Sequence, residues 1–151
     1  RFAKPRTMER LVVGAGEGIR ALSEQAKHEG RYVFMHAIQA LALETAEAAA
    51  EYVHSLVRAA WGFPDPPTMT MADRFVSRYR GKRYSFGYPA CPRLEDQEPL
   101  FRLLSPERIG VRLTDGFMMD PEASVSALVF HHPGAKYFGV GNAADGIEGG
   151  D

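Results

Sequence analysis

Apolar and polar positions follow two different periods along this chain, a helical one in the first half and an alternating one in the second. Apolar and small residues recur in steps of four and three at Phe34, Ile38, Leu41, Thr45, Ala48 and Tyr52. This spacing predicts one long helix over about residues 32–61, with a continuous apolar stripe. The alanine-rich segment 46–50 raises the helix propensity and lets a neighbouring element approach closely. Gly62 and Pro64 end the helix.

The segment before this helix predicts a strand, a turn and a shorter helix. Residues 11–13 are an apolar strand candidate, and the glycines of residues 14–18 favour a strand-to-helix turn. Their spacing is Gly-x-Gly-x-Gly and no βαβ pattern follows, which disfavours a dinucleotide-binding loop. Apolar residues over 19–26 share one helical face, and Gly30 ends that helix.

Shorter elements follow the long helix. Thr70 and Asp73 resemble a capping box, and Gly81 is predicted to close the short helix that they begin. The buried side of this short helix is predicted to be Met71, Phe75 and Val76. Residues 100–104 predict another short helix, and residues 105–107 a turn or a new helix start.

From Gly110 the period changes to two. Residues 111–114, 116–119 and 124–131 are predicted to be extended, the last with Val125, Ala127 and Val129 on one face. A turn at residues 133–134 would lead into a strand over 136–140, which predicts an antiparallel hairpin. The expected fold class is therefore α+β, with long helices packed on an antiparallel β-sheet.

Composition narrows the classes of protein. The chain has 151 residues, about one domain, and a net charge of −1, so no strong field favours nucleic acid or an anionic membrane. No apolar run approaches the roughly 20 residues that span a bilayer, and no secretory signal is visible. The single cysteine, Cys91, excludes an intrachain disulfide and favours a reducing, cytoplasmic setting. Because the chain begins at Arg1 without an initiator methionine, we expect a fragment of a longer protein.

Residues 80–92 concentrate the candidate chemistry. The run mixes arginines, a lysine, aromatics, glycines and prolines, which predicts an ordered loop with a short extended piece at 83–86. Such loops often carry function, although a rigid connector would have the same composition.

Other candidate residues have an ordinary structural interpretation beside a functional one. Glu44, Glu47 and Glu51 share one helix face, either as a solvated acidic surface or as carboxylates for a cationic ligand. His36 and His54 are eighteen residues apart, which favours surface or satisfied core histidines over metal ligands. His131 and His132 are adjacent in a predicted strand, point to opposite faces and cannot chelate together. Neither a Gly-x-Ser-x-Gly elbow nor a cysteine-protease signature is present.

Several motifs together resemble one known family. The pattern Arg-x-x-x-Gly-Tyr-Pro-Ala-Cys-Pro over residues 83–92 resembles the signature of the C-terminal activation domain of cobalamin-dependent methionine synthase. Further matching blocks lie, in order, at residues 46–54, 61–63, 79–83, 113–118, 123–126 and 132–138. The resemblance covers roughly residues 11–140 and implies the α+β fold of that domain.

The resemblance also implies a ligand and the residues that hold it. In that family the domain holds S-adenosylmethionine, which methylates cobalamin that has been oxidised to an inactive state and then reduced. By motif, Arg83 is expected to hold the ligand carboxylate, as a guanidinium can do bidentately. Glu47 is expected near the sulfonium, because a carboxylate favours a positive centre. The remaining expected contacts are Gly87, Tyr88, Ala90, Tyr137 and Phe138, with Gly87 allowing close approach of the backbone.

What the resemblance implies for the whole protein goes beyond this chain. We expect residues 1–151 to form a single domain, most of an activation domain without its N-terminal segment. It would have no catalytic residue or metal ligand of its own, because methyl transfer needs proximity and alignment. Cobalamin and zinc would lie on other modules of a cytoplasmic methyltransferase. A flavodoxin-like or other reductase would donate electrons.

Two points remain open at the level of the sequence. Ser77 stands where the family pattern has a second acidic residue, which removes one charge from the sulfonium environment. The alternative to a methionine synthase module is a stand-alone S-adenosylmethionine-binding reactivation partner or sensor.

Overall fold

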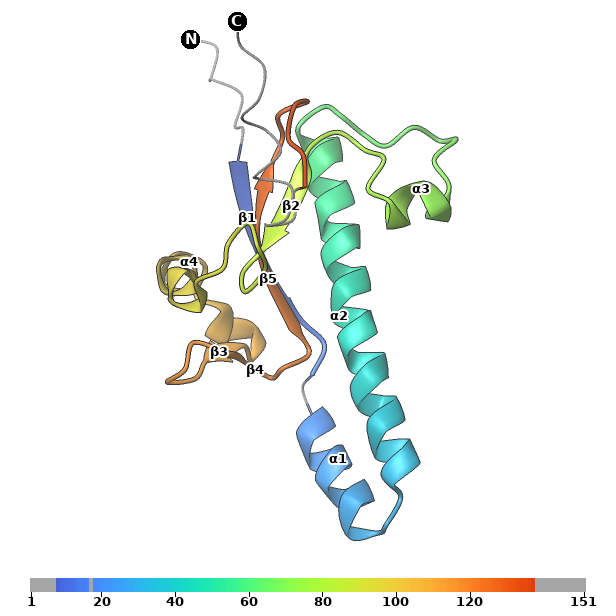
Figure 1. Cartoon of the computed structure of the whole chain (residues 1–151), viewed down its shortest axis with the longest axis vertical. Helices are drawn as coiled ribbons and strands as arrows, with labels where there is room; N and C mark the ends of the chain where they lie inside the picture. The colour runs from blue at the N-terminus through green and yellow to red at the C-terminus, as the bar shows by residue number, and fades with distance from the viewer. Residues whose placement is uncertain (1–7, 17, 138–151) are drawn as a thin grey trace, which may run out of the picture.

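A computed structural model describes residues 8–16 and 18–137 of the chain. Its centre is a three-stranded antiparallel sheet in the order β1-β5-β2, made of Met8–Gly14, Ser124–Phe130 and Lys82–Ser85 (Figure 1). Leu11 lies opposite Ala127, and Arg83 lies opposite Val129. The expected α+β class with an antiparallel sheet is confirmed. The extended piece predicted within residues 80–92 is the edge strand β2.

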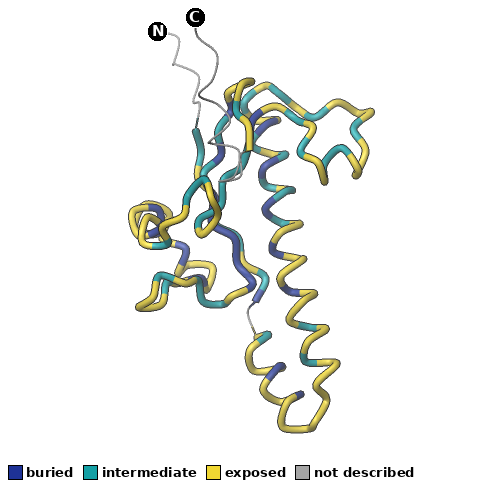
Figure 2. Tube along the Cα trace, viewed as in Figure 1, coloured by how far each residue is buried: buried dark blue, intermediate teal, exposed yellow. Residues whose placement is uncertain are grey.

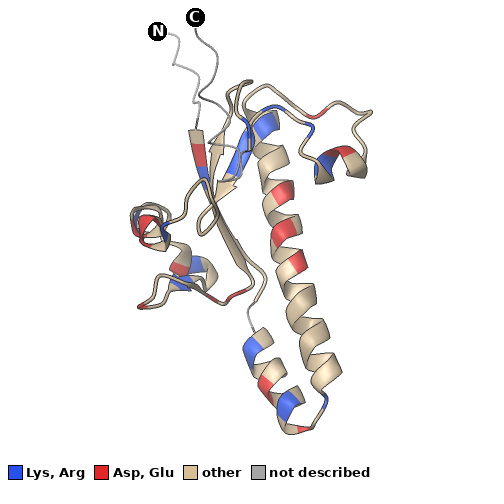
Figure 3. Cartoon of the chain, in the orientation of Figure 1, with Lys and Arg blue, Asp and Glu red and all other residues tan. Residues whose placement is uncertain are grey.

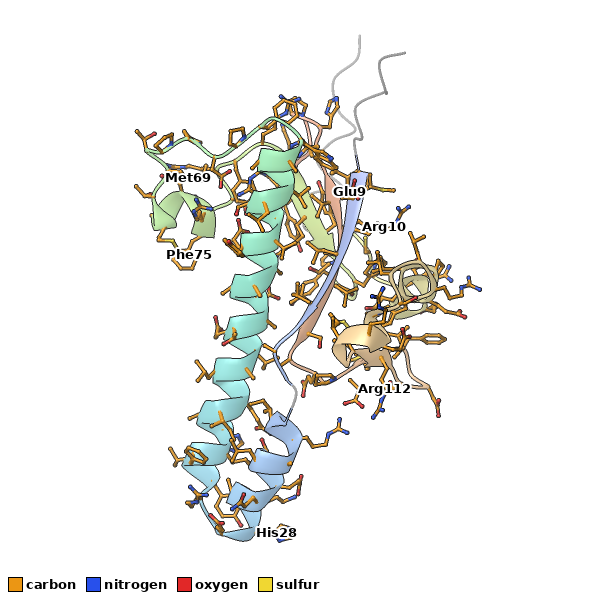
Figure 4. All side chains as sticks on the ribbon, turned by 180° about the vertical axis from the view of Figure 1, so that it is seen from behind. Glu9, Arg10, His28, Met69, Phe75 and Arg112 are labelled. Carbon is orange, nitrogen blue, oxygen red and sulfur yellow. The ribbon has the colours of Figure 1, made fainter. Side chains whose placement is uncertain are left out.

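Helix α2, Tyr32–Ala60, lies along one side of this sheet. Helix α4, Glu98–Leu104, and a small sheet of β3, Arg112–Leu113, with β4, Met119–Asp120, lie on the other side. Figure 4 shows the same division from behind. Short 3-10 helices at Leu94–Gln97 and Pro106–Ile109 flank α4. The second one begins where a turn or a new helix start was predicted.

The core lies between α2 and the sheet. Its buried members are Leu11, Ala46, Ala50, Val125, Ala127 and Val129. Along α2 burial recurs every four residues at Ala42, Ala46, Ala50, His54 and Arg58. Figure 2 shows this buried line on the side of α2 that faces the sheet. The predicted inward face of residues 124–131 is confirmed, because Val125 is 6% exposed and Ala127 and Val129 are fully buried.

The long helix is confirmed, but the predicted apolar stripe does not face the core. Leu41 is 67% exposed and Tyr52 65% exposed, whereas Ala42, Ala46 and Ala50 are buried. The reason is that the small side chains of β5 let α2 approach the strand closely. A close approach leaves room only for small residues on that face of the helix. Periodicity gave the correct helix and the wrong face.

Helix α1, Ile19–His28, packs against the first half of α2, and both extend beyond the sheet (Figures 1 and 2). Gly18 and Gly30 have φ values of 76° and 71° at its two ends. These confirm the predicted turn into α1 and the glycine that ends it. In the described part of the chain no helix is both long and apolar enough to cross a membrane.

Helix α3, Met71–Phe75, has the predicted capping box between Thr70 and Asp73, but its predicted buried side is wrong. Met71, Phe75 and Val76 are 63%, 83% and 62% exposed, because no element of the described chain covers them. Ser77, with φ 51°, follows its last turn and closes it, which Gly81 was predicted to do. Gly81 instead leads into β2, where a Cβ atom would come within 2.4 Å of the Phe130 carbonyl oxygen.

The end of the described chain differs from the predicted hairpin. The turn at residues 133–134 is present, but Lys136 and Tyr137 are not in a strand. The rest of the predicted strand over 136–140 lies outside the described residues. Within the described ranges, β5 pairs with β1 on one side and with β2 on the other.

Candidate functional site

A cleft of about 1100 Å³ opens between α2, α3 and β2. Figure 3 shows acidic residues along the second half of α2 beside basic residues on β2 and α3. The charged residues that line the cleft are Glu44, Glu47, Glu51, Arg74, Lys82 and Arg83. The aromatic residues that line it are Tyr52, Phe75, Tyr79, Tyr88 and Tyr137. The cleft therefore offers carboxylates, cations and aromatic walls to one ligand.

Helix α2 supplies the acidic wall. Glu44, Glu47 and Glu51 lie three and four residues apart, so one helix face points all three into the cleft. The Glu47 side chain is 51% exposed, and the Glu51 side chain is 24% exposed. The acidic face predicted from the sequence is thus one wall of a cleft.

Arg83 projects from the edge strand β2 into the cleft. Its side chain is 17% exposed, and Nη2 donates a hydrogen bond to Glu47 Oε2 at 3.0 Å. Nη1 is buried and has no hydrogen-bond partner among the described residues. A buried guanidinium nitrogen without an acceptor is costly, so this edge of Arg83 can still donate a hydrogen bond to a further carboxylate oxygen.

A tight turn follows β2. Gly87, with φ 84°, donates its N–H to the Cys91 carbonyl at 2.8 Å, and Cys91 donates to the Tyr88 carbonyl at 2.8 Å. The turn places Tyr88 at the cleft, whereas Gly87 and Ala90 are not among its lining residues.

A second aromatic wall comes from the segment after β5. Tyr137 lines the cleft, and its ring stacks on Tyr84 with centroids 6.0 Å apart. The Tyr84 hydroxyl donates to the Lys136 carbonyl at 2.7 Å, which ties this segment to β2. Phe138, the other residue predicted here, lies outside the described residues.

At one end of the cleft lies Arg58, which is fully buried near the end of α2. Its Nε and Nη2 donate to the two carboxylate oxygens of Asp65 at 2.6 and 2.7 Å. Arg74 donates to the same carboxylate at 2.9 Å, and the Tyr79 ring lies 3.8 Å from the Arg58 guanidinium. Hydrogen bonding to Arg58 lowers the pKa of Asp65. These bonds fasten the segment 61–79 to α2.

Tyr79 links this end of the cleft to Glu51. Its hydroxyl donates to Glu51 Oε2 at 2.9 Å, and the Ser77 hydroxyl lies 3.3 Å from the same phenol oxygen. The Lys82 ammonium donates to the carbonyls of Ser77 and Tyr79 at 2.8 and 3.2 Å. Burial, and then the charge of Arg58, lower the pKa of Lys82.

The buried histidines are core residues with few polar contacts. His54 is fully buried, and its ring centroid lies 5.1 Å from that of Tyr79 in an edge-to-face arrangement. Burial, followed by the charge of Arg58, lowers the pKa of His54 to about 3. Neither ring nitrogen has a hydrogen-bond partner among the described residues, so His54 is a core histidine, but not the satisfied one that was predicted. His131 is buried between Trp61 and Phe63 while His132 is exposed, but both follow the end of β5, so the strand predicted to hold them ends before them. No group of metal-ligating side chains gathers within the described ranges.

Comparison with known proteins identifies the family of the chain. A model of the vitamin B12 dependent methionine synthase activation domain matches residues 3–147. The chain belongs to this family. Curated methionine synthases of Mycobacterium leprae and Mycobacterium tuberculosis are each 42% identical to it over 109 residues, 68% of this chain. The crystal structure of the MetH reactivation domain bound to AdoHcy superposes with a TM-score of 0.80 and 32% identity over 88% of the chain.

The chain matches only a part of the length of each relative. It spans 9% of the length of the curated methionine synthases and 42% of the chain in the solved structure. The relatives are methionine synthases, so the stand-alone alternative is not favoured.

The structure brings together four of the predicted ligand residues, Glu47, Arg83, Tyr88 and Tyr137, on one cleft. Sequence reasoning named Glu51 as a carboxylate for a cationic ligand, but it gave no role to Arg58, Asp65, Arg74, Tyr79 and Lys82, which support the cleft. One signal for this support was available, because Glu51 and Arg58 are seven residues apart and therefore share a helix face.

Proposed function

We propose that this chain binds S-adenosylmethionine in the cleft between α2, α3 and β2, as the reactivation module of a cobalamin-dependent methionine synthase. The observation that carries the proposal is Arg83 at the wall of the cleft, with one buried guanidinium nitrogen that has no partner among the described residues. A ligand carboxylate would satisfy that nitrogen. The AdoHcy bound to the related domain carries such a carboxylate, which supports the same ligand class here.

The rest of the cleft suits the other parts of this ligand. Tyr137 and Tyr88 provide aromatic faces for the adenosine, with Phe138 and the backbone around Gly87 and Ala90 as further contacts. Glu47 holds the other side of the Arg83 guanidinium, so a ligand carboxylate would share Arg83 with it. Glu47 also places a negative charge beside the site for a positive sulfonium.

For the whole protein we propose the activity of its relatives. The bound S-adenosylmethionine would supply the methyl group for reductive remethylation of inactive cobalamin. Cobalamin and zinc would be held by other modules of the same cytoplasmic methyltransferase, and a flavodoxin-like or other reductase would donate the electron. Residues 1–151 would form most of one activation domain. Within it, the protein's contribution is binding and alignment of the methyl donor.

Titration calorimetry with the Arg83→Ala variant tests the ligand assignment. Loss of a charged hydrogen bond costs about 1.5–3 kcal/mol, so S-adenosylmethionine should bind roughly ten- to a hundredfold more weakly. Arg93→Ala is the matched control, because Arg93 is 67% exposed and its partners among the described residues, Glu95 and Asp96, do not line the cleft. Unchanged affinity in a folded Arg83→Ala protein would refute the assignment.

A further inference from the structure

Two carboxylates of α2 face the cleft one helical turn apart, and their surroundings differ. The Glu47 side chain is 51% exposed and accepts a hydrogen bond from Arg83 at 3.0 Å. The Glu51 side chain is 24% exposed and accepts one from the Tyr79 hydroxyl at 2.9 Å. Water and a cation inside the cleft therefore screen the charge of Glu47, whereas a neutral phenol fixes the carboxylate of Glu51 in a drier place.

The buried Arg58 weakens this contrast only in part. Its Nη2 lies 3.5 Å from Glu51 Oε1, at the long limit of a hydrogen bond. The same guanidinium makes two bonds of 2.6 and 2.7 Å to Asp65. Asp65 is thus the main counter-ion of Arg58, and the pairing of Arg58 with Glu51 is the weaker one.

The cations at this end of the cleft would repel a positively charged ligand group, and the negative charge of Glu51 offsets this repulsion. Arg74 and Lys82 both line the cleft, and the Lys82 ammonium lies 5.3 Å from the Tyr79 ring centroid. Without the charge of Glu51, Glu44 and Glu47 would be the carboxylates left among the lining residues, and Asp65 is bonded to Arg74. The field at this end would then favour a cation less.

We infer that Glu51 is the residue that makes the cleft prefer a positively charged sulfonium over a neutral thioether, with Tyr79 as its positioning residue. This inference rests on the proposed function, because it assigns the charge selectivity of that same site. It transfers to Glu51 a role that the sequence motif gave to Glu47. Glu47 is then chiefly the partner that aligns Arg83.

The test compares two ligands that differ in this charge. Dissociation constants for S-adenosylmethionine and S-adenosylhomocysteine are measured by calorimetry on the unmodified chain and on Glu51→Gln. The substitution keeps an acceptor for Tyr79 and removes the charge. At the effective dielectric of a partly wet cleft we expect roughly tenfold weaker binding of S-adenosylmethionine and less than about twofold for S-adenosylhomocysteine.

Two further substitutions provide reference values for the change in the ratio of the two affinities. Glu47→Gln removes the same charge one turn away and should change the ratio of the two affinities less than Glu51→Gln does. Glu107→Gln is the control for net charge, because Glu107 lies in the 3-10 helix Pro106–Ile109 on the opposite side of the sheet. It should leave the ratio unchanged.

Tyr79→Phe tests the positioning role without altering any charged residue. The ring over Arg58 remains and only the hydroxyl that holds Glu51 is lost. The ratio should shift in the same direction as in Glu51→Gln but by less, and adding Tyr79→Phe to Glu51→Gln should shift it no further. A merely structural role for Tyr79 would weaken both ligands equally in either background.

The outcomes separate the two levels of the proposal. If the unmodified chain binds neither ligand, the proposed function fails and the assignment of Glu51 fails with it. If it binds both and Glu51→Gln weakens both equally, only the assignment of Glu51 is overturned. A larger change of the ratio in Glu47→Gln would return the role to Glu47. Should Glu51→Gln not fold, the shift in Tyr79→Phe decides, and its absence overturns the inference.

Discussion

The two halves of α2 differ in what they bury. The first half leaves apolar side chains on its surface, with Val33 86% exposed and Leu41 67% exposed. The second half buries a histidine and an arginine completely. The first half packs on α1, whereas the second faces the sheet and the segment that forms the end of the cleft. Burial along α2 therefore depends on the element opposite each turn, and polar side chains are buried where they support the cleft.

Removing Arg58 should have the largest effect on folding. Arg58→Met leaves the carboxylate of Asp65, of which 8% of the side chain is exposed, without its bidentate partner. Breaking a buried ion pair in this way should lower the free energy of unfolding by about 3 kcal/mol, measured by urea denaturation. Arg93→Met removes an exposed arginine and should stay within about 0.5 kcal/mol. Equal midpoints for the two variants would contradict the supporting role of Arg58.

A larger side chain on the alanine face should be the next most damaging change. Ala50 is fully buried against the sheet, so Ala50→Leu should destabilise the protein by about 1–3 kcal/mol through overpacking. The matched change on the exposed stripe is Leu41→Ala, which should stay within about 0.5 kcal/mol. Thermal unfolding of both variants checks the order. If Leu41→Ala is the more damaging, the sequence-based stripe was the true core face.

His54 should make stability depend on pH. Its pKa is lowered to about 3 in the folded protein from an ordinary 6.5, mainly by burial, so the unfolded chain binds the proton more readily. Its contribution is fully present above pH 6.5 and is lost as the pH falls from there towards 3. The slope should be at most about 1.4 kcal/mol per pH unit.

Urea denaturation between pH 7.5 and 5.5 measures this slope, since most carboxylates are still ionised in that range. His54→Gln should flatten it, and His36→Gln, on the exposed first half of α2, should not. An equally steep slope in His54→Gln would show that another group carries the pH dependence.

The sequence was a good guide where local chemistry decides the structure. The capping box at Thr70, the glycines around α1 and the alternation along β5 each depend on neighbouring residues, and all are present. The family motifs located the cleft, because the segments that carry Glu47, Arg83, Tyr88 and Tyr137 come together on it. The roles of these residues toward a ligand remain predictions.

The sequence was a poor guide where distant elements decide. Whether the alanine or the leucine face of α2 is buried depends on the small side chains of β5, more than 70 residues away along the chain. The place of β1 at the edge of β5 could not be read from a turn, because no turn joins them. The Arg58–Asp65 pair looks like two ordinary surface charges until the chain turns back over the end of α2.

The left-handed backbone at Ser77 has a consequence for engineering the charge of this site. An acidic side chain introduced at position 77 would have to adopt φ 51°, which residues other than glycine and asparagine adopt at a cost. Ala48 lines the same cleft from regular helix, between Glu44 and Glu51. A designer who wishes to tune the affinity for sulfonium ligands therefore has a relaxed position on the helix and a strained one in the loop. Libraries of variants should be richer in folded, altered binders at position 48 than at position 77.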